Sequence, residues 1–536
     1  MTMITLLLAF TAAVTDPMEW LYPDSEVEKV NVFSETDVPA DGTVDANILL
    51  NGLKPGEPVR LSASVAGGEW CEMLSVPVEY NSGHIYFVEK PGETNEFVVR
   101  RAPYRVYDAL KPLAGAEFTP TSSVAGVRFA IDAKKLAAAK TALDFVICHD
   151  GSCEKLSLLA RVHPAKSAAD CPAEEFRYVN WASFRNMADR HGLERWSDAH
   201  YAMIDRYIAL AVRNRQNAVW LPNEDMFVAA TEDGVENILA TNRLDRLMEI
   251  FNRNHVQWIE GGHLCGRGEG GWKSTNLVVR GIWKGVDRPE AVAEFQTQCE
   301  QIMGFIRRHH LEKRWLQHVM DEPVQCCMAS YYRACGIVRR FMPGIPLLDA
   351  VELPGFEGAL DIVCPKDYMW QQNQDSFEYA RTNCGQHVWC YTCCAPGGKW
   401  MNRLLDGELL RPLYMFATAD SKHIEGYLHW GYNHWQEQQD PFNMRCITNW
   451  GGVATSTLPA GDTHIVYPGD NGPWSGVRLE ATRQGMEDCE LFRKLRTRDP
   501  KRADELLSRI ARAFDDYETD VRKYRQVRRE LLEAIR

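Results

Sequence analysis

Two adjacent carboxylates, Asp321 and Glu322, close the apolar stretch 315–320 and stand directly before Pro323. A short apolar run with amphipathic segments on both sides is typical of a buried parallel strand. Pro323 cannot donate a ladder hydrogen bond and restricts Glu322 to extended geometry, so we expect the strand to end at the acidic pair. Catalytic groups sit at the carboxyl ends of strands in β/α architectures, which makes this pair the first candidate for chemistry.

The elements that must position this pair form a regular alternation of strand and helix patterns. The expected strands are residues 178–181, 218–222, 256–264, 315–323, 346–351, 362–365, 388–391 and 426–435. Helical patterns are expected at residues 198–214, 244–254, 288–310, 326–340, 376–383 and 409–420. Eight alternations predict a (β/α)8 TIM-type barrel over residues 173–450, with the acidic pair at the end of the fourth strand.

The segments on either side of this barrel have a different pattern. Between residues 18 and 165, short β-type runs alternate with turn sequences, as at 46–50, 59–65, 84–88, 96–99, 127–131 and 143–148. This spacing predicts an N-terminal β-sandwich. Residues 164–172 are the expected linker. A C-terminal extension, residues 451–536, contains a strand candidate at 464–467 and a charged helical region at 500–535.

The first residues, 1–17, contain an apolar run at 4–14. Its length is that of the hydrophobic part of a signal peptide and is too short to cross a bilayer. No Lys or Arg precedes it, so two hypotheses stay open: an export signal of a secreted or periplasmic protein, or a disordered start of a cytoplasmic one. No other stretch is long enough to span a membrane.

The composition is that of an ordinary globular protein. The 536 residues are 45% hydrophobic and 25% charged, and the net charge of −13 is spread along the chain. No basic stripe with interleaved aromatic residues is present, so we expect no nucleic-acid partner. The chain has 16 tryptophans. Core packing accounts for most of them, but Trp and Tyr surfaces also suit flat apolar ligands such as sugar rings.

The 16 cysteines do not indicate a disulfide scaffold in a chain of this length. Cys148 and Cys153 bracket a turn sequence and could pair across a hairpin in an exported protein. The segment from Cys390 to Cys394 contains a CxxC, but no second pair follows at zinc spacing, so buried thiols are expected there. We expect neither a metal nor a cofactor.

A glycine-rich segment, residues 261–271, follows the third expected strand. Its glycine spacing fits neither a phosphate-binding loop nor a dinucleotide fingerprint, so we expect a mobile loop over the barrel mouth. His263 lies at the start of this segment. Ligand contact and structural support are both open for it.

Aromatic residues mark the last two expected strands. Tyr391 lies on the seventh, and Trp430, Asn433 and Trp435 lie on the eighth. In a barrel these residues surround the same mouth as the acidic pair, where rings could stack on a sugar and an amide could bind its hydroxyls. Packing against outer helices is the alternative for each. Because side chains alternate along a strand, Trp430 and Asn433 cannot both face inward unless the strand ends between them.

Several of these features together resemble glycoside hydrolase family 123. They are the Met-Asp-Glu-Pro strand end at 320–323, the β-sandwich before a barrel, the segment 426–433 and the tail motifs within 459–480. The family comprises β-N-acetylgalactosaminidases and many uncharacterised relatives. The resemblance implies removal of terminal β-linked N-acetylhexosamine, chiefly N-acetylgalactosamine, with retention, through an oxazoline formed by the substrate's own acetamido group. It makes Glu322 the general acid/base and Asp321 the carboxylate that orients the acetamido group.

The residues themselves support this mechanism in part. Neighbouring carboxylates share one strand end, so they cannot easily place a water-activating base across the sugar, as inversion requires. Like charges this close push their pKa values apart, and we expect Glu322 to be protonated and Asp321 ionised. Two alternatives stay open: a β-N-acetylglucosaminidase or other hexosaminidase that uses the same pair, and a catalytically silent carbohydrate-binding protein. The expected partner is a glycan or glycoconjugate, and the oligomeric state is open.

Overall fold

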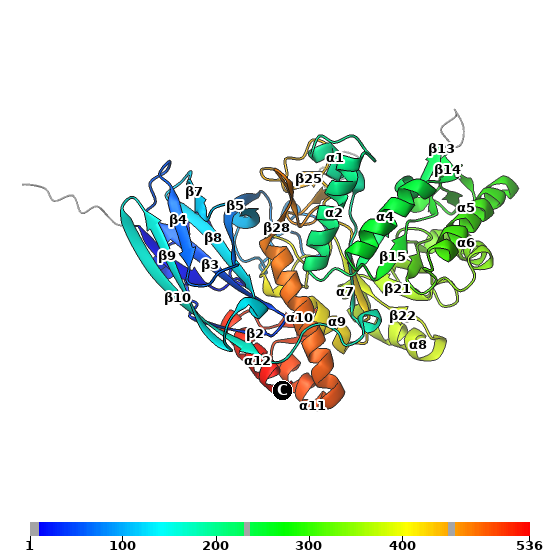
Figure 1. Ribbon diagram of the computed structural model, residues 1–536. Coiled ribbons are helices and arrows are strands. Elements are labelled where there is room, and N and C mark those ends of the chain that lie inside the picture. The colour runs from blue at the N-terminus through cyan, green and yellow to red at the C-terminus, as the bar shows by residue number, and fades with distance from the viewer. Residues whose placement is uncertain (1–9, 230–235, 449–455, 536) are drawn as a thin grey trace, which may run out of the picture. The chain divides into compact units, whose positions relative to one another are not determined.

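The structure is a computed structural model that describes residues 10–229, 236–448 and 456–535 (Figure 1). The chain divides into two compact units. The first comprises residues 1–171, 397–418 and 435–536, and the second comprises residues 172–396 and 419–434. The chain therefore leaves the first unit near the expected linker at 164–172 and returns to it twice. The expected domain boundaries stay predictions.

The first unit contains two large sheets. The seven-stranded sheet has the order β1 (Thr11–Thr15), β3 (Thr43–Asn51), β8 (Val124–Asp132), β5 (Glu69–Val78), β6 (Tyr104–Pro112), β28 (Gly472–Gly476) and β27 (Tyr467–Gly469). The five-stranded sheet has the order β2 (Glu35–Pro39), β10 (Ser152–His163), β9 (Lys140–His149), β4 (Val59–Ala63) and β7 (Glu117–Phe118). The pairs are antiparallel except β2 with β10. The C-terminal strands β27 and β28 thus complete a sheet begun at the other end of the chain.

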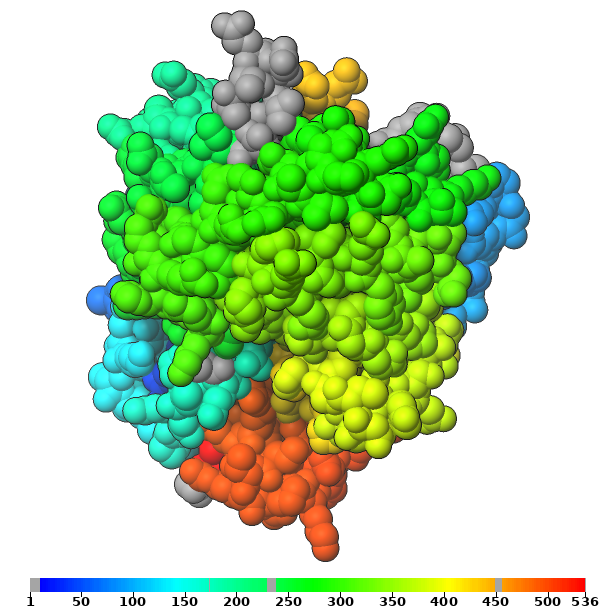
Figure 2. Space-filling model, turned by 90° about the vertical axis from the view of Figure 1, so that its right-hand side faces the viewer, coloured from blue at the N-terminus to red at the C-terminus, as the bar shows by residue number. Residues whose placement is uncertain are grey.

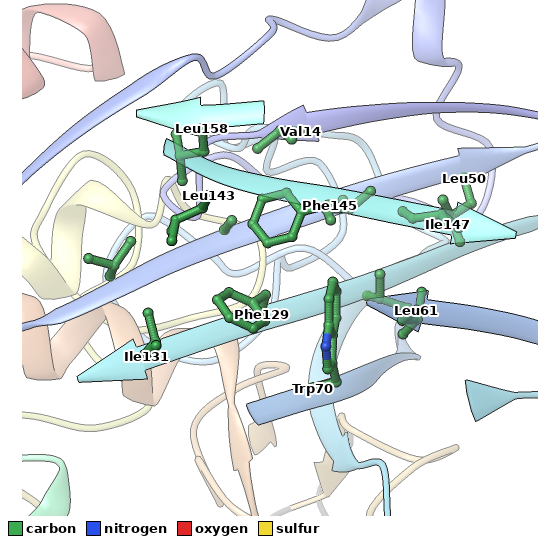
Figure 3. Packing of buried hydrophobic residues seen from close by; sticks show 14 of the residues in the cluster. Val14, Leu50, Leu61, Trp70, Phe129, Ile131, Leu143, Phe145, Ile147 and Leu158 are labelled. Carbon is green, nitrogen blue, oxygen red and sulfur yellow. The ribbon is translucent and has the colours of Figure 1, made fainter. Parts of the chain in front are cut away.

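One hydrophobic cluster joins these two sheets (Figure 3). Trp70 and Phe129 of the seven-stranded sheet have ring centroids 4.9 Å apart, and Phe129 meets Phe145 of the five-stranded sheet at 5.2 Å. Alternate residues of each strand supply this core, as expected for sheets with one buried face. Mixed β and α/β architecture is confirmed, and the β-sandwich remains our interpretation of this pair of sheets.

The strand at the beginning of the described chain lies in the segment for which a signal or a disordered start was expected. Strand β1 pairs antiparallel with β3 from Thr11 to Thr15. Residues 1–9 lie outside the described residues, and export stays a prediction. The expected pairing of Cys148 with Cys153 is present as a disulfide across β9 and β10.

The prediction of two of the strands in this unit is wrong. Residues 84–88 and 96–99 form turns and bends, with only an isolated bridge between Ser82 and Val88. Side-chain acceptors take up backbone N–H groups in these segments: Glu93 accepts from the N–H of His84 at 2.7 Å, and Asn95 accepts from the N–H of Phe97 at 3.0 Å. Satisfied in this way, the backbone needs no partner strand.

The C-terminal part of the first unit holds three helices: α10 (Val477–Arg498), α11 (Pro500–Ser508) and α12 (Val521–Ala534). Helix α10 is buried along most of its length despite its many charges. Arg483 pairs with Asp45 and Glu487, and Arg478 pairs with Asp108 at 2.8 Å. Paired and hydrogen-bonded charges can be buried at tolerable cost, so the arginine and glutamate of the 477–480 motif lie in the core of this unit.

The second unit consists of parallel strands with helices between them. Three of its sheets are parallel and have the orders β11 (Arg177–Asn180), β24 (Gly426–His429), β23 (Cys390–Thr392); β12 (Ala218–Leu221), β15 (Trp258–Gly261), β19 (Trp315–Gln317); and β20 (Leu348–Val351), β21 (Ile362–Pro365), β22 (His387–Val388). Isolated parallel bridges join Gln317 to Leu347 and Lys366 to Tyr391. Each of the eight expected strands therefore overlaps an observed one.

The helices of this unit are α1 (Phe184–Arg190), α2 (Asp198–Arg213), α3 (Asn223–Met226), α4 (Thr241–Arg253), α5 (Pro289–Arg308), α6 (Met328–Phe341), α7 (Asp367–Gln372) and α8 (Gln374–Cys384). A ninth helix, α9 (Leu410–Ser421), leads the chain back from the first unit. Ser197 caps α2 through its hydroxyl, which accepts from the N–H of His200. Residues of the green to yellow-green part of the chain form much of the face seen in Figure 2.

One hydrophobic cluster collects residues from strands of all three sheets, among them Val179, Trp220, Leu316, Leu348 and Tyr391. A common core of this kind is what the interior of a barrel requires. The three sheets and two bridges support an α/β unit of parallel strands, and a fully closed (β/α)8 barrel stays a prediction.

Candidate active site

The acidic pair follows β19 but does not end it. Strand β19 stops at Gln317, and Asp321 and Glu322 lie four and five residues further on. Glu322 has a φ of 47°, in the left-handed region, so the extended geometry expected from Pro323 is wrong. A residue other than glycine rarely adopts this conformation, which costs about 1–3 kcal/mol and is found most often at functional sites.

A buried carboxylate holds the backbone that leads to the pair. Asp349, at the second position of β20, accepts from the N–H groups of Val319 and Met320 at 3.1 Å. It also accepts from Nδ1 of His318 at 3.0 Å and from the hydroxyl of Tyr331 at 2.6 Å. These bonds satisfy the backbone after β19 has ended, where no strand ladder is available.

His318 lies between two carboxylates. Its Nε2 faces Glu260 of β15 at 3.3 Å, and the indole N–H of Trp181 donates to the same Glu260 oxygen at 2.9 Å. Burial lowers the pKa of His318, but hydrogen bonds to Asp349 and Glu260 outweigh burial and raise it to about 9. The imidazolium therefore partly neutralises the buried acids beneath the pair.

The carboxylate of Glu322 contacts a buried cation and a phenol. Lys366, which follows β21 and is 1% exposed, approaches Oε1 of Glu322 to 3.1 Å and also pairs with Glu352. The hydroxyl of Tyr391 donates to the same Glu322 oxygen and accepts from Lys366 Nζ at 2.5 Å. Lys366, directly after β21, and Tyr391 of β23 thus meet Glu322 in the segment after β19.

These contacts separate the two carboxyl groups electrostatically. Burial and the neighbouring Glu322 charge raise the pKa of Asp321 to about 7. Burial also raises the pKa of Glu322, but the Lys366 charge and the hydrogen bond from Tyr391 outweigh it, and the net pKa lies below its ordinary value. The expectation of a protonated Glu322 beside an ionised Asp321 is therefore reversed in the unliganded protein, because sequence could not place Lys366.

The glycine-rich segment folds into a small antiparallel sheet of β16 (Cys265–Arg267), β17 (Leu277–Val279) and β18 (Lys284–Gly285). We call residues 265–285 the flap. It begins beside the pair, since the N–H of Cys265 donates to the Val319 carbonyl at 2.8 Å. A Cβ at Gly262 would lie 2.5 Å from the carbonyl oxygen of Leu221, so this close approach requires glycine.

Three of the five expected ligand residues, Tyr391, Trp430 and His263, lie in the second unit close to its core. Tyr391 contacts Glu322 directly, and half-buried Trp430 packs against the cluster to which Tyr391 belongs. His263 is 4% exposed, with its ring centroid 4.8 Å from that of His318. Burial lowers the pKa of His263 well below its ordinary value, so the ring is neutral and supports the core under the pair.

The other two expected ligand residues are placed differently. The amide of Asn433 accepts from the N–H of Ser183 at 2.7 Å and donates to its carbonyl at 3.0 Å. This bond pair ties the segment after β24 to the start of α1, and we interpret Asn433 as support. Trp435 belongs to the first unit, where its ring meets His464 edge-on at 6.0 Å. A sugar contact by either residue stays a prediction.

One group among the described residues has the composition of a metal site. One donor atom each from His263, His318 and Asp349 lies within 4.8 Å of the others. Both nitrogens of His318 face carboxylates, and Asp349 already accepts two backbone N–H groups. A metal needs an unprotonated histidine, so this donor set fits a hydrogen-bonded ion cluster better.

Sequence reasoning missed Lys366, Glu352, Asp349 and Arg267. Lys366 directly follows the apolar strand 362–365, which is the same signal that identified the acidic pair. Asp349 is a charged residue inside an apolar strand, and such a residue needs a buried partner. Arg267 and Glu352 carry no comparable signal in the sequence.

Paired carboxyls that follow a strand, with separated pKa values, are typical of glycoside hydrolases. A comparison with family models indicates which family of glycoside hydrolases the chain resembles. Residues 281–495 match the model described as "Glycoside hydrolase 123, catalytic domain", and this match confirms the resemblance to that family over those residues. No curated protein matches the chain.

One solved structure has a similar fold. A family 123 glycoside hydrolase from Clostridium perfringens, described in a study of glycolipid glycan hydrolysis, is 11% identical and superposes with a TM-score of 0.70 over 98% of this chain and 97% of its own. An endo-β-1,4-mannanase from Thermotoga petrophila is 9% identical, with a TM-score of 0.37 over 59% and 77% of the two chains. The first superposition shows a shared fold, and the second is too weak to support a conclusion.

No helix among residues 10–229, 236–448 and 456–535 is long and apolar enough to cross a membrane.

Proposed function

We propose that this glycosidase removes terminal β-linked N-acetylhexosamine, chiefly N-acetylgalactosamine, by retaining, substrate-assisted catalysis at Asp321 and Glu322. The observation that carries the proposal is the unequal setting of two adjacent carboxyls. Asp321 has a pKa raised to about 7, whereas Lys366 and Tyr391 lower that of Glu322. Near neutral pH the pair therefore holds a single proton, which is what one acid and one carboxylate require.

In the proposed reaction the acetamido oxygen of the substrate attacks the anomeric carbon. A cyclic oxazoline forms, the glycosidic bond breaks, and the leaving oxygen takes the proton of Glu322. Asp321, as a carboxylate, accepts the N–H of the acetamido group and stabilises the positive charge of the ring. Water then opens the oxazoline, and Glu322 accepts a proton from that water, which restores the pair.

For this reaction, the single proton must move from Asp321 to Glu322. In the free protein it resides on Asp321, because Glu322 is held as a carboxylate by Lys366. An amide N–H that donates to Asp321 favours its ionised form, so substrate binding shifts the proton to Glu322, where the leaving oxygen needs it. Lys366 keeps Glu352 as its second carboxylate partner when Glu322 becomes neutral.

The surroundings also support a sugar ring at this place. Tyr391 and half-buried Trp430 share one cluster beside the pair, and an aromatic face suits the apolar face of a pyranose. Glu352 and the pair supply carboxylate acceptors for hydroxyl groups. Galacto and gluco substrates differ in whether O4 is axial or equatorial. The preference of the enzyme depends on which of these groups binds O4.

The test is a panel of aryl glycosides. We expect turnover of aryl β-N-acetylgalactosaminide, slower turnover of the gluco epimer, and very slow turnover of the 2-hydroxy galactoside, which lacks the internal nucleophile. Preference for the gluco epimer supports the alternative N-acetylglucosaminidase. Equal turnover of the 2-hydroxy sugar argues against substrate assistance. Binding of N-acetylhexosamine without turnover of any member supports the alternative of a silent carbohydrate-binding protein.

A further inference from the structure

Adjacent residues of an extended chain point their side chains to opposite sides. The two carboxyls of the pair nevertheless share one environment: Asp321 lies within the electrostatic influence of Glu322, His318 and Asp349, while Glu322 contacts Lys366. A left-handed residue, such as Glu322 with φ at 47°, breaks this alternation and allows neighbouring side chains to face the same side. Something must hold this strained peptide in place.

The flap supplies a clamp. One guanidinium nitrogen of Arg267, Nη2, donates to the carbonyl oxygen of Asp321 at 3.0 Å and to that of Glu322 at 2.8 Å. These are the two carbonyl groups on either side of the strained φ. A charged donor makes stronger hydrogen bonds than a neutral one, and a single nitrogen that binds both oxygens fixes their relative orientation.

Further contacts of the flap hold the clamp itself. The guanidinium carbon of Arg267 lies 3.5 Å from the centroid of the Trp272 ring, a close cation–π contact. Cys326, four residues after Glu322, contacts the carbonyl of Ser274 through its sulfur at 3.3 Å, and the N–H of Leu277 donates to Ser330 of α6 at 2.9 Å. The flap is thus tied to the chain immediately after the pair.

We propose that Arg267 is a positioning residue for the reaction: by binding both carbonyl oxygens of the acidic pair, it holds Glu322 in the left-handed conformation that aims both carboxyls at one sugar. This inference rests on the proposed function. Arg267 contacts no substrate in this role. Its loss lets the peptide relax and misplaces the general acid, and displacements of about 1 Å cost about 10²-fold in rate.

The experiment replaces Arg267 by Met, which keeps the aliphatic stem, and by Lys, which keeps the charge. For Arg267→Met we expect kcat on an aryl N-acetylhexosaminide to fall about 10²-fold while KM changes less than about threefold. Arg267→Lys should recover part of kcat, because one ammonium can still reach a carbonyl. Arg267→Ala should be partly rescued by added ethylguanidine, which restores the donor.

The matched control is Arg280→Met. Arg280 belongs to the same flap but points its Nε at the Cys265 carbonyl, at 3.4 Å, and not at the pair. We expect its kcat to stay within about threefold of the wild type. Equal losses in both variants, or a loss in Arg267→Met that follows a matching fall in melting temperature without guanidine rescue, would assign Arg267 to general flap stability.

A structural readout separates this inference from the proposed function. The crystal structure of Arg267→Met should show Glu322 at a negative φ. If the wild type hydrolyses no aryl glycoside, the proposed function fails while this readout still decides the clamp. A Glu322 that keeps its positive φ, together with wild-type kcat, overturns the inference.

Discussion

Replacing Lys366 by Met should move the acid limb of the pH–activity profile. Lys366 is the only cation within ion-pair distance of the Glu322 carboxylate among the described residues, at 3.1 Å. Its removal stabilises the neutral form of Glu322 and raises the pKa of that group. Glu352 loses the same partner, so a second carboxylate near Glu322 adds to the rise.

The magnitude follows from the distance. Two unit charges 3.1 Å apart interact by about 1 kcal/mol in water and by about 5 kcal/mol at an effective dielectric constant of 20. These limits correspond to about one to four pKa units. The side chain of Glu322 is 17% exposed and that of Lys366 is 1% exposed, which excludes neither limit but favours an intermediate rise of about two units.

The assay is kcat/KM for an aryl N-acetylhexosaminide from pH 4 to pH 9, because this quantity reports pKa values of the free enzyme. The wild type should keep its activity down to about pH 4.5, and Lys366→Met should lose activity below about pH 6. Glu352→Gln is the opposite control. It keeps the ion pair between Lys366 and Glu322, so the acid limb should not move to higher pH. An acid limb of Lys366→Met that coincides with the wild type refutes the role of Lys366.

Three further predictions concern the pair and its surroundings. Glu322→Gln should slow hydrolysis of substrates with poor leaving groups about 10²–10⁴-fold and acidic phenol glycosides far less; equal losses would remove Glu322 from the acid role. Asp321→Asn should raise the free energy of unfolding, measured in urea, by about 1–4 kcal/mol at pH 8 and little at pH 4. Because the pKa of Asp321 is about 7 in the folded protein and ordinarily 3.8, the wild type loses stability as the pH rises above 3.8. An equal effect of the substitution at both pH values contradicts this. Trp430→Ala should raise KM without changing the melting temperature, whereas a parallel loss of stability would assign Trp430 to packing.

The strands of the second unit could be predicted because their signal is local. Short apolar runs separated by amphipathic helices placed all eight, and β21 matches its expected bounds at 362–365. The acidic pair was found for the same reason, since charges directly after an apolar run are conspicuous. Strand lengths were less predictable: β19 was expected to reach residue 323 but ends at Gln317, where Asp349 takes over its hydrogen bonding.

What escaped prediction depends on partners distant in the sequence. Lys366, 44 residues from Glu322, makes the pKa of Glu322 the lower of the two in the pair. Arg267, 55 residues from Glu322, holds the backbone of that residue. The preference of a residue before proline for extended geometry is weaker than these contacts. Helix α10 was missed because it is buried on nearly all sides with its charges paired, so it has no apolar stripe to recognise.

One inhibition constant tests substrate assistance through Asp321 most directly. A thiazoline derived from N-acetylgalactosamine mimics the proposed cyclic intermediate, and such analogues typically bind about 10²–10⁸-fold more tightly than substrate. We predict competitive inhibition at least about 10²-fold tighter than KM for the wild type, and a marked weakening in Asp321→Asn, which offers no negative charge to the ring. Failure of the thiazoline to inhibit, or equal inhibition of both proteins, would contradict substrate assistance through Asp321.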